Sequence, residues 1–280
     1  MRRLSPAWQV ILAAVLLGSS GVFVKNLDLP PTTLAFFRMG LPVIFLFFYL
    51  EEQHLHIWKK FNRTILLSSL FSVLHIVFFY VGFLNTSMTN AVLVLYTWPI
   101  FENIISIIFL KEKTSKRNLI LLGTAFLGVF LTFVDKEISL ENGDFVGMGA
   151  MLICALCYAI SLAILKEEAD NYTYPELVFY QNSLGFAVYL PFFLLNTPFP
   201  TVNQLALGSA YGLLIGVVAF DLMFSGLKKL PVSIASDLSY VEAISAIAFG
   251  VIFFGDVITW NTLLGGSLIL GSTMAFREKV

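Results

Sequence analysis

Long apolar runs separated by short polar turns dominate the hydrophobic and polar pattern of the chain. Most of the runs approach or exceed the roughly 20 residues that a helix needs to cross about 30 Å of hydrocarbon. None alternates as a membrane β-strand would, and only a helix satisfies every backbone polar group within its own segment. The pattern therefore predicts an all-α membrane protein with ten transmembrane helices, at Ala7–Val24, Leu34–Leu50, Thr64–Leu84, Thr89–Leu110, Asn118–Val134, Phe145–Leu165, Leu177–Leu195, Leu205–Leu227, Val232–Phe254 and Asn261–Phe276.

The two halves of the chain repeat one pattern. Residues Gly82–Lys113 align with Gly226–Val257 at an offset of 144 positions, which places Tyr96 on Tyr240. A period of half the chain indicates an internal duplication. We therefore predict two five-helix repeats, at residues 1–137 and 138–280.

An odd number of helices in each repeat fixes how the repeats are related. The second repeat must enter the membrane from the opposite side, which makes an inverted repeat with a pseudo-two-fold axis in the membrane plane. Transporters use this arrangement to exchange outward-open and inward-open shapes around a site near the midplane. The first run follows Arg2 and Arg3 as a signal peptide would, but its removal would unpair the repeats, so we interpret it as the first membrane helix.

Charged residues are scarce and unevenly placed. They make up 12% of the 280 residues, against roughly 25% in a soluble domain. Fourteen of the 17 Lys and Arg residues lie on the side that carries both termini, which predicts cytoplasmic termini. The net charge of −1 excludes the basic field of a nucleic-acid-binding protein, and two cysteines exclude a disulfide framework. The chain has no phosphate-binding Gly-rich loop, so we expect neither ATP-driven transport nor a cofactor.

Polar side chains inside the runs are costly in lipid and are therefore the first candidates for a functional site. Glu102, Glu242 and His75 lie near the middle of the fourth, ninth and third runs. A buried carboxyl is hard to ionise, so each glutamate is a candidate for proton coupling or cation binding, or else a neutral, hydrogen-bonded packing residue. His75 is either a site residue or a hydrogen-bonded histidine between helices. Pro99 should bend the fourth helix at mid-depth and free a carbonyl group.

Aromatic residues accompany these polar ones. On a helical wheel one arc of the fourth run carries a polar and aromatic stripe that should face the site, made of Tyr96, Trp98, Pro99, Glu102, Asn103 and Ser106. We predict substrate-binding side chains among the aromatic residues of several runs, namely Tyr80, Tyr96, Trp98, Tyr158 and Tyr240, with Tyr180 as a further candidate. In a chain that is 15% aromatic, each of these side chains could instead pack in the core or against lipid.

Other polar and small residues have structural explanations. Arg38 lies five residues from the outer end of the second run, so its side chain should snorkel outward. Cys154 and Cys157 share one helix face, as packing residues do. Small residues at four-residue spacing let helices approach closely, and this spacing occurs at Gly208, Gly212 and Gly216.

Three short motifs resemble those of a known family. The first run ends in LGSSGVFVK at Leu17–Lys25, the fourth contains YTWP at Tyr96–Pro99, and the ninth contains YVEA at Tyr240–Ala243. They are similar to the Trp-Gly-Ser…Lys and Tyr-Leu-Glu-Pro patterns of EamA-type members of the drug/metabolite transporter superfamily, and the resemblance covers nearly the whole chain. Leu17 stands where the family usually has Trp, and each half keeps only part of the second pattern. The resemblance implies ten helices in two repeats, and transport, mostly outward, of amino acids, other metabolites, drugs or choline-like cations.

These observations favour a secondary transporter, more specifically an exporter, of small organic metabolites such as amino acids, working by alternating access with proton coupling as a hypothesis. An aromatic pocket beside a carboxylate would also suit a quaternary ammonium cation. From other classes, Gly18–Gly21 resembles the Gly-x-Ser-Gly of intramembrane serine proteases, with His75 as a base for Ser20, and a receptor without transport is a further alternative. The expected partners are the solute and the bilayer of a bacterial inner membrane, with the chain as a monomer or homodimer and without nucleic acid.

Overall fold

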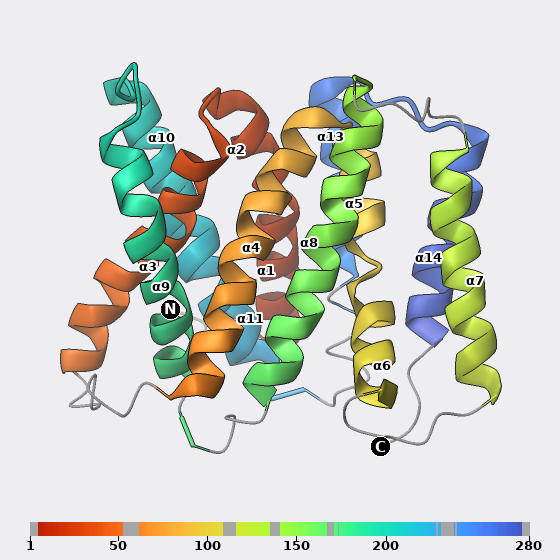
Figure 1. The fold of residues 1–280 in the computed structure, drawn as a ribbon, viewed down its shortest axis with the longest axis horizontal. Helices are drawn as coiled ribbons and strands as arrows, with labels where there is room; N and C mark the ends of the chain where they lie inside the picture. The colour runs from red at the N-terminus through yellow and green to blue at the C-terminus, as the bar shows by residue number, and fades with distance from the viewer. Residues whose placement is uncertain are drawn as a thin grey trace.

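The computed structural model of the chain is helical throughout the membrane-spanning segments that it describes (Figure 1). It describes residues 5–52, 62–108, 116–134, 141–166, 171–172, 174–227, 229–230, 238 and 240–275. The first repeat contains α1 (Pro6–Gly18), α2 (Ser20–Leu27), α3 (Pro31–Glu52), α4 (Arg63–Asn85), α5 (Met88–Leu95), α6 (Trp98–Ile108) and α7 (Lys116–Phe133). The second contains α8 (Gly143–Lys166), α9 (Tyr174–Leu194), α10 (Val202–Leu213), η1 (Leu214–Ala219), α11 (Phe220–Leu227), α13 (Val241–Phe254) and α14 (Trp260–Ala275).

These helices account for the ten predicted segments, because α1 continues into α2, α5 into α6, and α10 through η1 into α11. The part of the ninth run before α13 falls mostly outside the described residues. Large apolar side chains such as Phe130, Leu195 and Trp260 lie exposed on the outside of the bundle, as contact with lipid requires. Among the residues that the structure describes, six spans are long and apolar enough to cross a membrane, at Pro6–Leu27, Pro31–Glu51, Arg63–Asn85, Gly143–Leu165, Pro175–Leu194 and Val202–Met223, and two shorter apolar helices lie at Ile120–Phe133 and Val241–Phe254.

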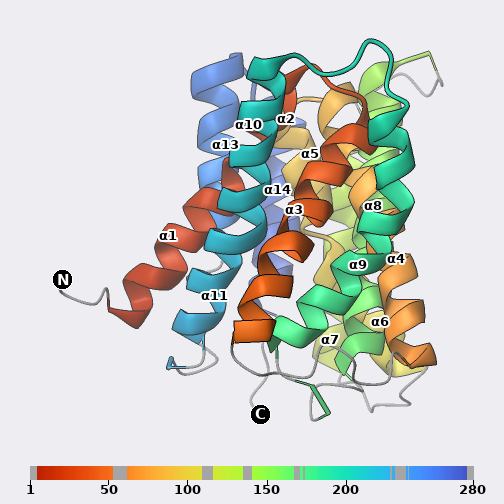
Figure 2. The same cartoon turned by 90° about the vertical axis from the view of Figure 1, so that its left-hand side faces the viewer.

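Packing between the two repeats follows a pseudo-two-fold axis. Equivalent helices meet in the pairs α3 with α9 and α7 with α14, which lie toward opposite ends of the long axis of the molecule (Figure 1). The equivalent fourth and ninth spans also meet where α5 packs on α13, and several other contacts occur in exchanged pairs: α4 packs on α8 as α1 packs on α11, and α6 packs on α8 as α1 packs on α13. The view in Figure 2 shows α3 and α9 in front, with α1 and α11 beside them. Exchange of the two repeats thus reproduces the packing, which confirms the inverted five-helix repeat.

Two spans of the first repeat are broken near the middle. The break expected at Pro99 is a full interruption, in which Tyr96 and Thr97 form a turn between α5 and α6. The first span was expected to be one helix, but it is interrupted at Ser19. The Ser19 hydroxyl donates a 2.6 Å hydrogen bond to the Leu16 carbonyl, and such a local bond competes with the helical ladder.

Glycines set the closest helix contacts. A Cβ atom on Gly208 would lie 2.6 Å from Cε2 of Phe37, and one on Gly216 would lie 3.2 Å from the Arg38 carbonyl oxygen. The predicted glycine stripe is therefore the face on which α10 and η1 pack against α3. Between α7 and α14 the glycines oppose each other, since a Cβ on Gly128 would lie 2.7 Å from the Gly265 oxygen.

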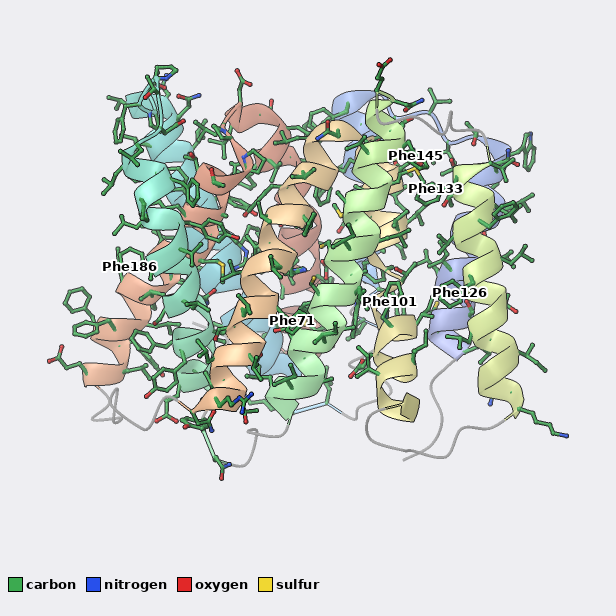
Figure 3. The ribbon with its side chains drawn as sticks, in the orientation of Figure 1. Phe71, Phe101, Phe126, Phe133, Phe145 and Phe186 are labelled. Carbon is green, nitrogen blue, oxygen red and sulfur yellow. The ribbon has the colours of Figure 1, made fainter. Side chains whose placement is uncertain are left out.

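Phenylalanine pairs join the α7–α14 unit to the rest of the bundle. Figure 3 shows Phe101 of α6 beside Phe126 of α7, and Phe133 of α7 beside Phe145 of α8. Their ring centroids are 6.3 Å and 6.2 Å apart, with the rings edge to face. Such aromatic pairs are worth roughly 0.5–1.5 kcal/mol beyond the area that they bury, so they hold α7 against both neighbours.

Candidate substrate site

A pair of tyrosines marks the pseudo-two-fold axis. Tyr96 and Tyr240 occupy equivalent positions in the two repeats, and their ring centroids are 5.8 Å apart. Tyr96 ends α5 and Tyr240 directly precedes α13, so each ring lies where regular helix stops or starts. Unwound backbone at the interface between inverted repeats is where transporters of this architecture bind solute.

Glu242 lies against this tyrosine pair. It stands in the first turn of α13, and the Tyr96 hydroxyl donates a hydrogen bond to its carboxylate. Tyr158 of α8 lies within electrostatic range of both Glu242 and Glu102. One glutamate from each repeat therefore acts electrostatically on the same tyrosine.

His75 of α4 completes this side of the cluster. Its imidazole stacks on the Tyr158 ring, with centroids 4.7 Å apart and planes 26° apart. Its Nδ1 lies 3.2 Å from Sγ and 3.3 Å from the carbonyl oxygen of Cys154. Trp98, in the first turn of α6, meets the Tyr158 ring edge to face at 5.3 Å. Tyr158 thus contacts a histidine and a tryptophan and lies within electrostatic range of two carboxylates.

A second tyrosine pair extends the cluster. Tyr80 and Tyr211 are both buried, and their hydroxyl oxygens are 2.9 Å apart in a hydrogen bond. Phe79 connects this pair to the imidazole, because its ring centroid is 5.4 Å from Tyr80 and 6.2 Å from His75.

The structure brings all eight sequence-predicted site residues into one connected cluster, although their role in binding stays a prediction. The further candidate Tyr180 lies elsewhere, in contact with Tyr172 and Phe179 beside the buried side chains of Leu50 and Ile65. Asn103 and Ser106 share the predicted stripe on α6, but their side chains lie outside the described part of the chain.

The prediction for Arg38 is wrong. Its guanidinium carbon lies 4.9 Å from the centroid of the Phe220 ring, and its charge acts on Tyr80, Tyr211, His75, Tyr158 and Glu242. Because α3 begins at Pro31, Arg38 lies about 10 Å below the helix end, deeper than the apolar run suggested. The side chain therefore points into the cluster instead of snorkelling outward.

Ser20 does not form the catalytic pair that a protease would need. It is buried and shares a hydrogen bond with the Tyr211 hydroxyl, whereas the described hydrogen bonds of the His75 ring go to Cys154. Among the described residues, no three His, Cys, Asp or Glu side chains are arranged to hold a metal ion. The cluster therefore offers aromatic faces, hydroxyls, two carboxylates and one guanidinium, which suits binding of a polar organic solute.

A separate polar cluster joins the repeats at the end opposite to the start of α1. The Lys25 ammonium donates a 2.7 Å hydrogen bond to the Thr86 carbonyl, and the charges of Asp256 and Asp144 act on it. The Thr86 hydroxyl donates to Asp144, and the Thr89 amide donates to Asp256 at 2.7 Å. We call these five residues the end lock, because they hold α2, α5, α8 and the end of α13 together.

Ten helices in two inverted repeats around a polar cluster define a membrane transporter. The chain belongs to the EamA-like transporter family, whose two repeats match residues 4–134 and 145–276. This is a family of transporters and not of enzymes, so the protease alternative does not hold.

Individual relatives fit this assignment. A protein of Archaeoglobus fulgidus named "Uncharacterized transporter" is 28% identical over 270 residues, covering 96% of this chain and 95% of that protein. The "Pseudopaline exporter CntI" of Pseudomonas aeruginosa is 22% identical, covering 96% of this chain and 94% of its own. A solved crystal structure shares the fold, with a TM-score of 0.62 at 16% identity over 96% of both chains.

Proposed function

We propose that the chain exports a small organic metabolite, such as an amino acid, from the bacterial cytoplasm by alternating access, with both termini inside and as a monomer or homodimer. The observation that carries this is the meeting of Tyr96, at the break between α5 and α6, with Tyr240 and Glu242 at the start of α13. Solute bound there touches both repeats, so a change in how the repeats pack changes its access to either side. The relative named as a pseudopaline exporter supports the outward direction.

The end lock supports one of the two states that alternating access requires. Its hydrogen bonds join helices of both repeats at one end of the bundle. With that end held together, solute enters the cluster from the other end, where α1 begins. Opening of the lock and closure of the opposite end then release the solute.

Glu242 is the residue that we assign to proton coupling, with Glu102 as its partner from the other repeat. A carboxyl group in a low-dielectric interior resists ionisation, so it can bind a proton in one state and exchange it for solute in the other. The Tyr96 hydroxyl that donates to Glu242 links the protonation state to the break between α5 and α6.

Flux in proteoliposomes tests this proposal. The solutes are radiolabelled amino acids, choline, nucleosides and sugars, each with and without an imposed proton gradient. We expect Glu242→Gln to lower gradient-driven flux at least about 10-fold and to lower exchange of solute for solute much less, because exchange does not depend on proton coupling. Asp221→Asn, at an exposed position on α11, is the matched control and should leave both rates unchanged. Unchanged gradient-driven flux in both Glu242→Gln and Glu102→Gln would contradict proton coupling through these residues.

A second candidate is export of a choline-like cation. Tyr96 donates a hydrogen bond to Glu242, and Trp98 packs on Tyr158, which lies within electrostatic range of both glutamates. Each aromatic face attracts such a cation by about 0.5–2 kcal/mol. Choline flux that Trp98→Ala abolishes would favour this solute over an amino acid. The proteoliposome series described above, which includes choline, measures this flux.

A further inference from the structure

Arg38 carries a charge without a counter-ion in the part of the chain that the structure describes. Its guanidinium packs on the Phe220 ring, but among the described residues no hydrogen bond and no ion pair involves it. An arginine has five N–H donors, and a charge inside the membrane is expensive unless it is paired. The pattern is that of a group whose partner is a ligand.

The surroundings of Arg38 place that ligand inside the cluster. Its charge acts on His75, Tyr158 and Glu242, which belong to α4, α8 and α13. Arg38 and Glu242, from different repeats, therefore lie within electrostatic range of each other without forming an ion pair. The Tyr80 and Tyr211 hydroxyls also lie within electrostatic range of the guanidinium. Two further hydrogen-bonding groups therefore lie on the Arg38 side of the cluster.

Phe220 and the glycine stripe hold Arg38 in position. The Phe220 ring occupies one face of the guanidinium, which leaves the edge with its N–H groups for an anion. The backbone of Arg38 also packs closely on η1, since a Cβ atom on Gly216 would lie 3.2 Å from the Arg38 carbonyl oxygen. A planar fork fixed in this way matches a carboxylate with two parallel hydrogen bonds.

We propose that Arg38 is a specificity-determining residue that binds the carboxylate of a zwitterionic solute, while Glu242 faces the ammonium group of the same molecule. This inference rests on the proposed function and narrows the solute class. A free amino acid carries both charges and satisfies both residues. A choline-like cation leaves the guanidinium unpaired and meets its repulsion, so the second candidate above is disfavoured.

Binding of matched derivatives tests the role of Arg38. Purified protein in detergent is titrated by calorimetry with leucine, phenylalanine and threonine, with their methyl esters and N-acetyl derivatives, and with choline. The esters lack the carboxylate charge and the acetylated acids lack the ammonium charge. We expect at least one free amino acid to bind about 10- to 100-fold more tightly than either of its derivatives, as the loss of a charged hydrogen-bonded pair implies.

Variants assign each charge to its residue. Arg38→Gln should bind the free acid and its ester equally, Arg38→Lys should retain part of the preference, and Glu242→Gln should lose only the discrimination against the acetylated acid. Arg63→Gln, at the exposed start of α4, is the control, and size-exclusion profiles verify folding. If Arg38→Gln does not fold, the preference of Arg38→Lys for the free acid over its ester, and that of Glu242→Gln for the free acid over the acetylated acid, still test the two assignments.

Two outcomes separate the failure of this inference from failure of the proposed function. Wild-type protein that binds choline or an ester more tightly than the free acid, or an unchanged preference in Arg38→Gln, would overturn the role of Arg38 and leave transport intact. Absence of flux for every solute in the proteoliposome series would overturn the proposed function, and this inference with it.

Discussion

Replacement of Lys25 by methionine should release the end of the bundle that the end lock holds together. Methionine keeps an unbranched apolar side chain, one atom shorter, but removes the 2.7 Å hydrogen bond to the Thr86 carbonyl and the attraction of Asp144 and Asp256. A hydrogen bond to a charged group is worth about 1.5–3 kcal/mol. Because the side chain is only half-buried, solvent screening brings the expected loss to the lower end. A loss of about 1.4 kcal/mol raises the population open at this end about tenfold.

Hydrogen–deuterium exchange measures that population directly. In Lys25→Met, amides of α5 and α13 should exchange about tenfold faster. Amides of α11, at the opposite end, should exchange more slowly, because opening of one end closes the other. Arg63→Met removes a charge at the exposed start of α4 and should alter neither region. Faster exchange in every helix would mean general destabilisation, and unchanged exchange in α5 and α13 would mean that Lys25 locks nothing.

Two further predictions concern packing, and apparent melting temperature in detergent checks both. Gly212→Ala should lower it, because the added Cβ would collide with the backbone of α3, whereas Gly149→Ala meets no atom within 4 Å and should raise it slightly through the helix propensity of alanine; equal shifts in both would contradict the close approach. Ser161→Ala should cost about 1–2 kcal/mol, because its hydroxyl donates a 2.9 Å hydrogen bond to the Ser68 carbonyl between α8 and α4. Ser183→Ala removes only a bond within its own helix and should cost less, so the reverse order would argue against a role for the α4–α8 bond.

The features that depend only on position along the chain, namely the repeats and the depth of polar residues, could be predicted from the sequence. The offset between Tyr96 and Tyr240 gave the duplication, and an odd number of helices per repeat gave its inverted form. The candidate site was also predicted from depth, because Glu102, Glu242 and His75 are polar residues near the middle of apolar runs. The contact of the Tyr96 and Tyr240 rings was not predicted, since equivalence in sequence does not require proximity.

The sequence does not determine how each helix is rotated about its own axis, and so does not determine which side chains face the interior of the bundle. The depth of Arg38 could be estimated, but whether its side chain faces lipid or the bundle depends on how α3 packs against α9 and α10. The end lock was missed for the same reason, because Lys25 finds its partners on other helices far along the chain. The sequence gives only a weak signal for Arg38 and Lys25, which are basic residues inside an apolar run and directly after one. Tertiary packing alone decides where each of these side chains points.

The wide turn at η1 has a geometric consequence for Arg38. A π-helix accommodates an extra residue within an otherwise α-helical span, and η1 ends directly before Phe220. Each residue of an α-helix advances the direction of a side chain by about 100°. If the same residues were wound as a regular α-helix, the Phe220 ring would therefore swing about a quarter turn away from the guanidinium. The contact between Phe220 and Arg38 thus depends on the helical rotation of this span, which the extra residue in η1 sets.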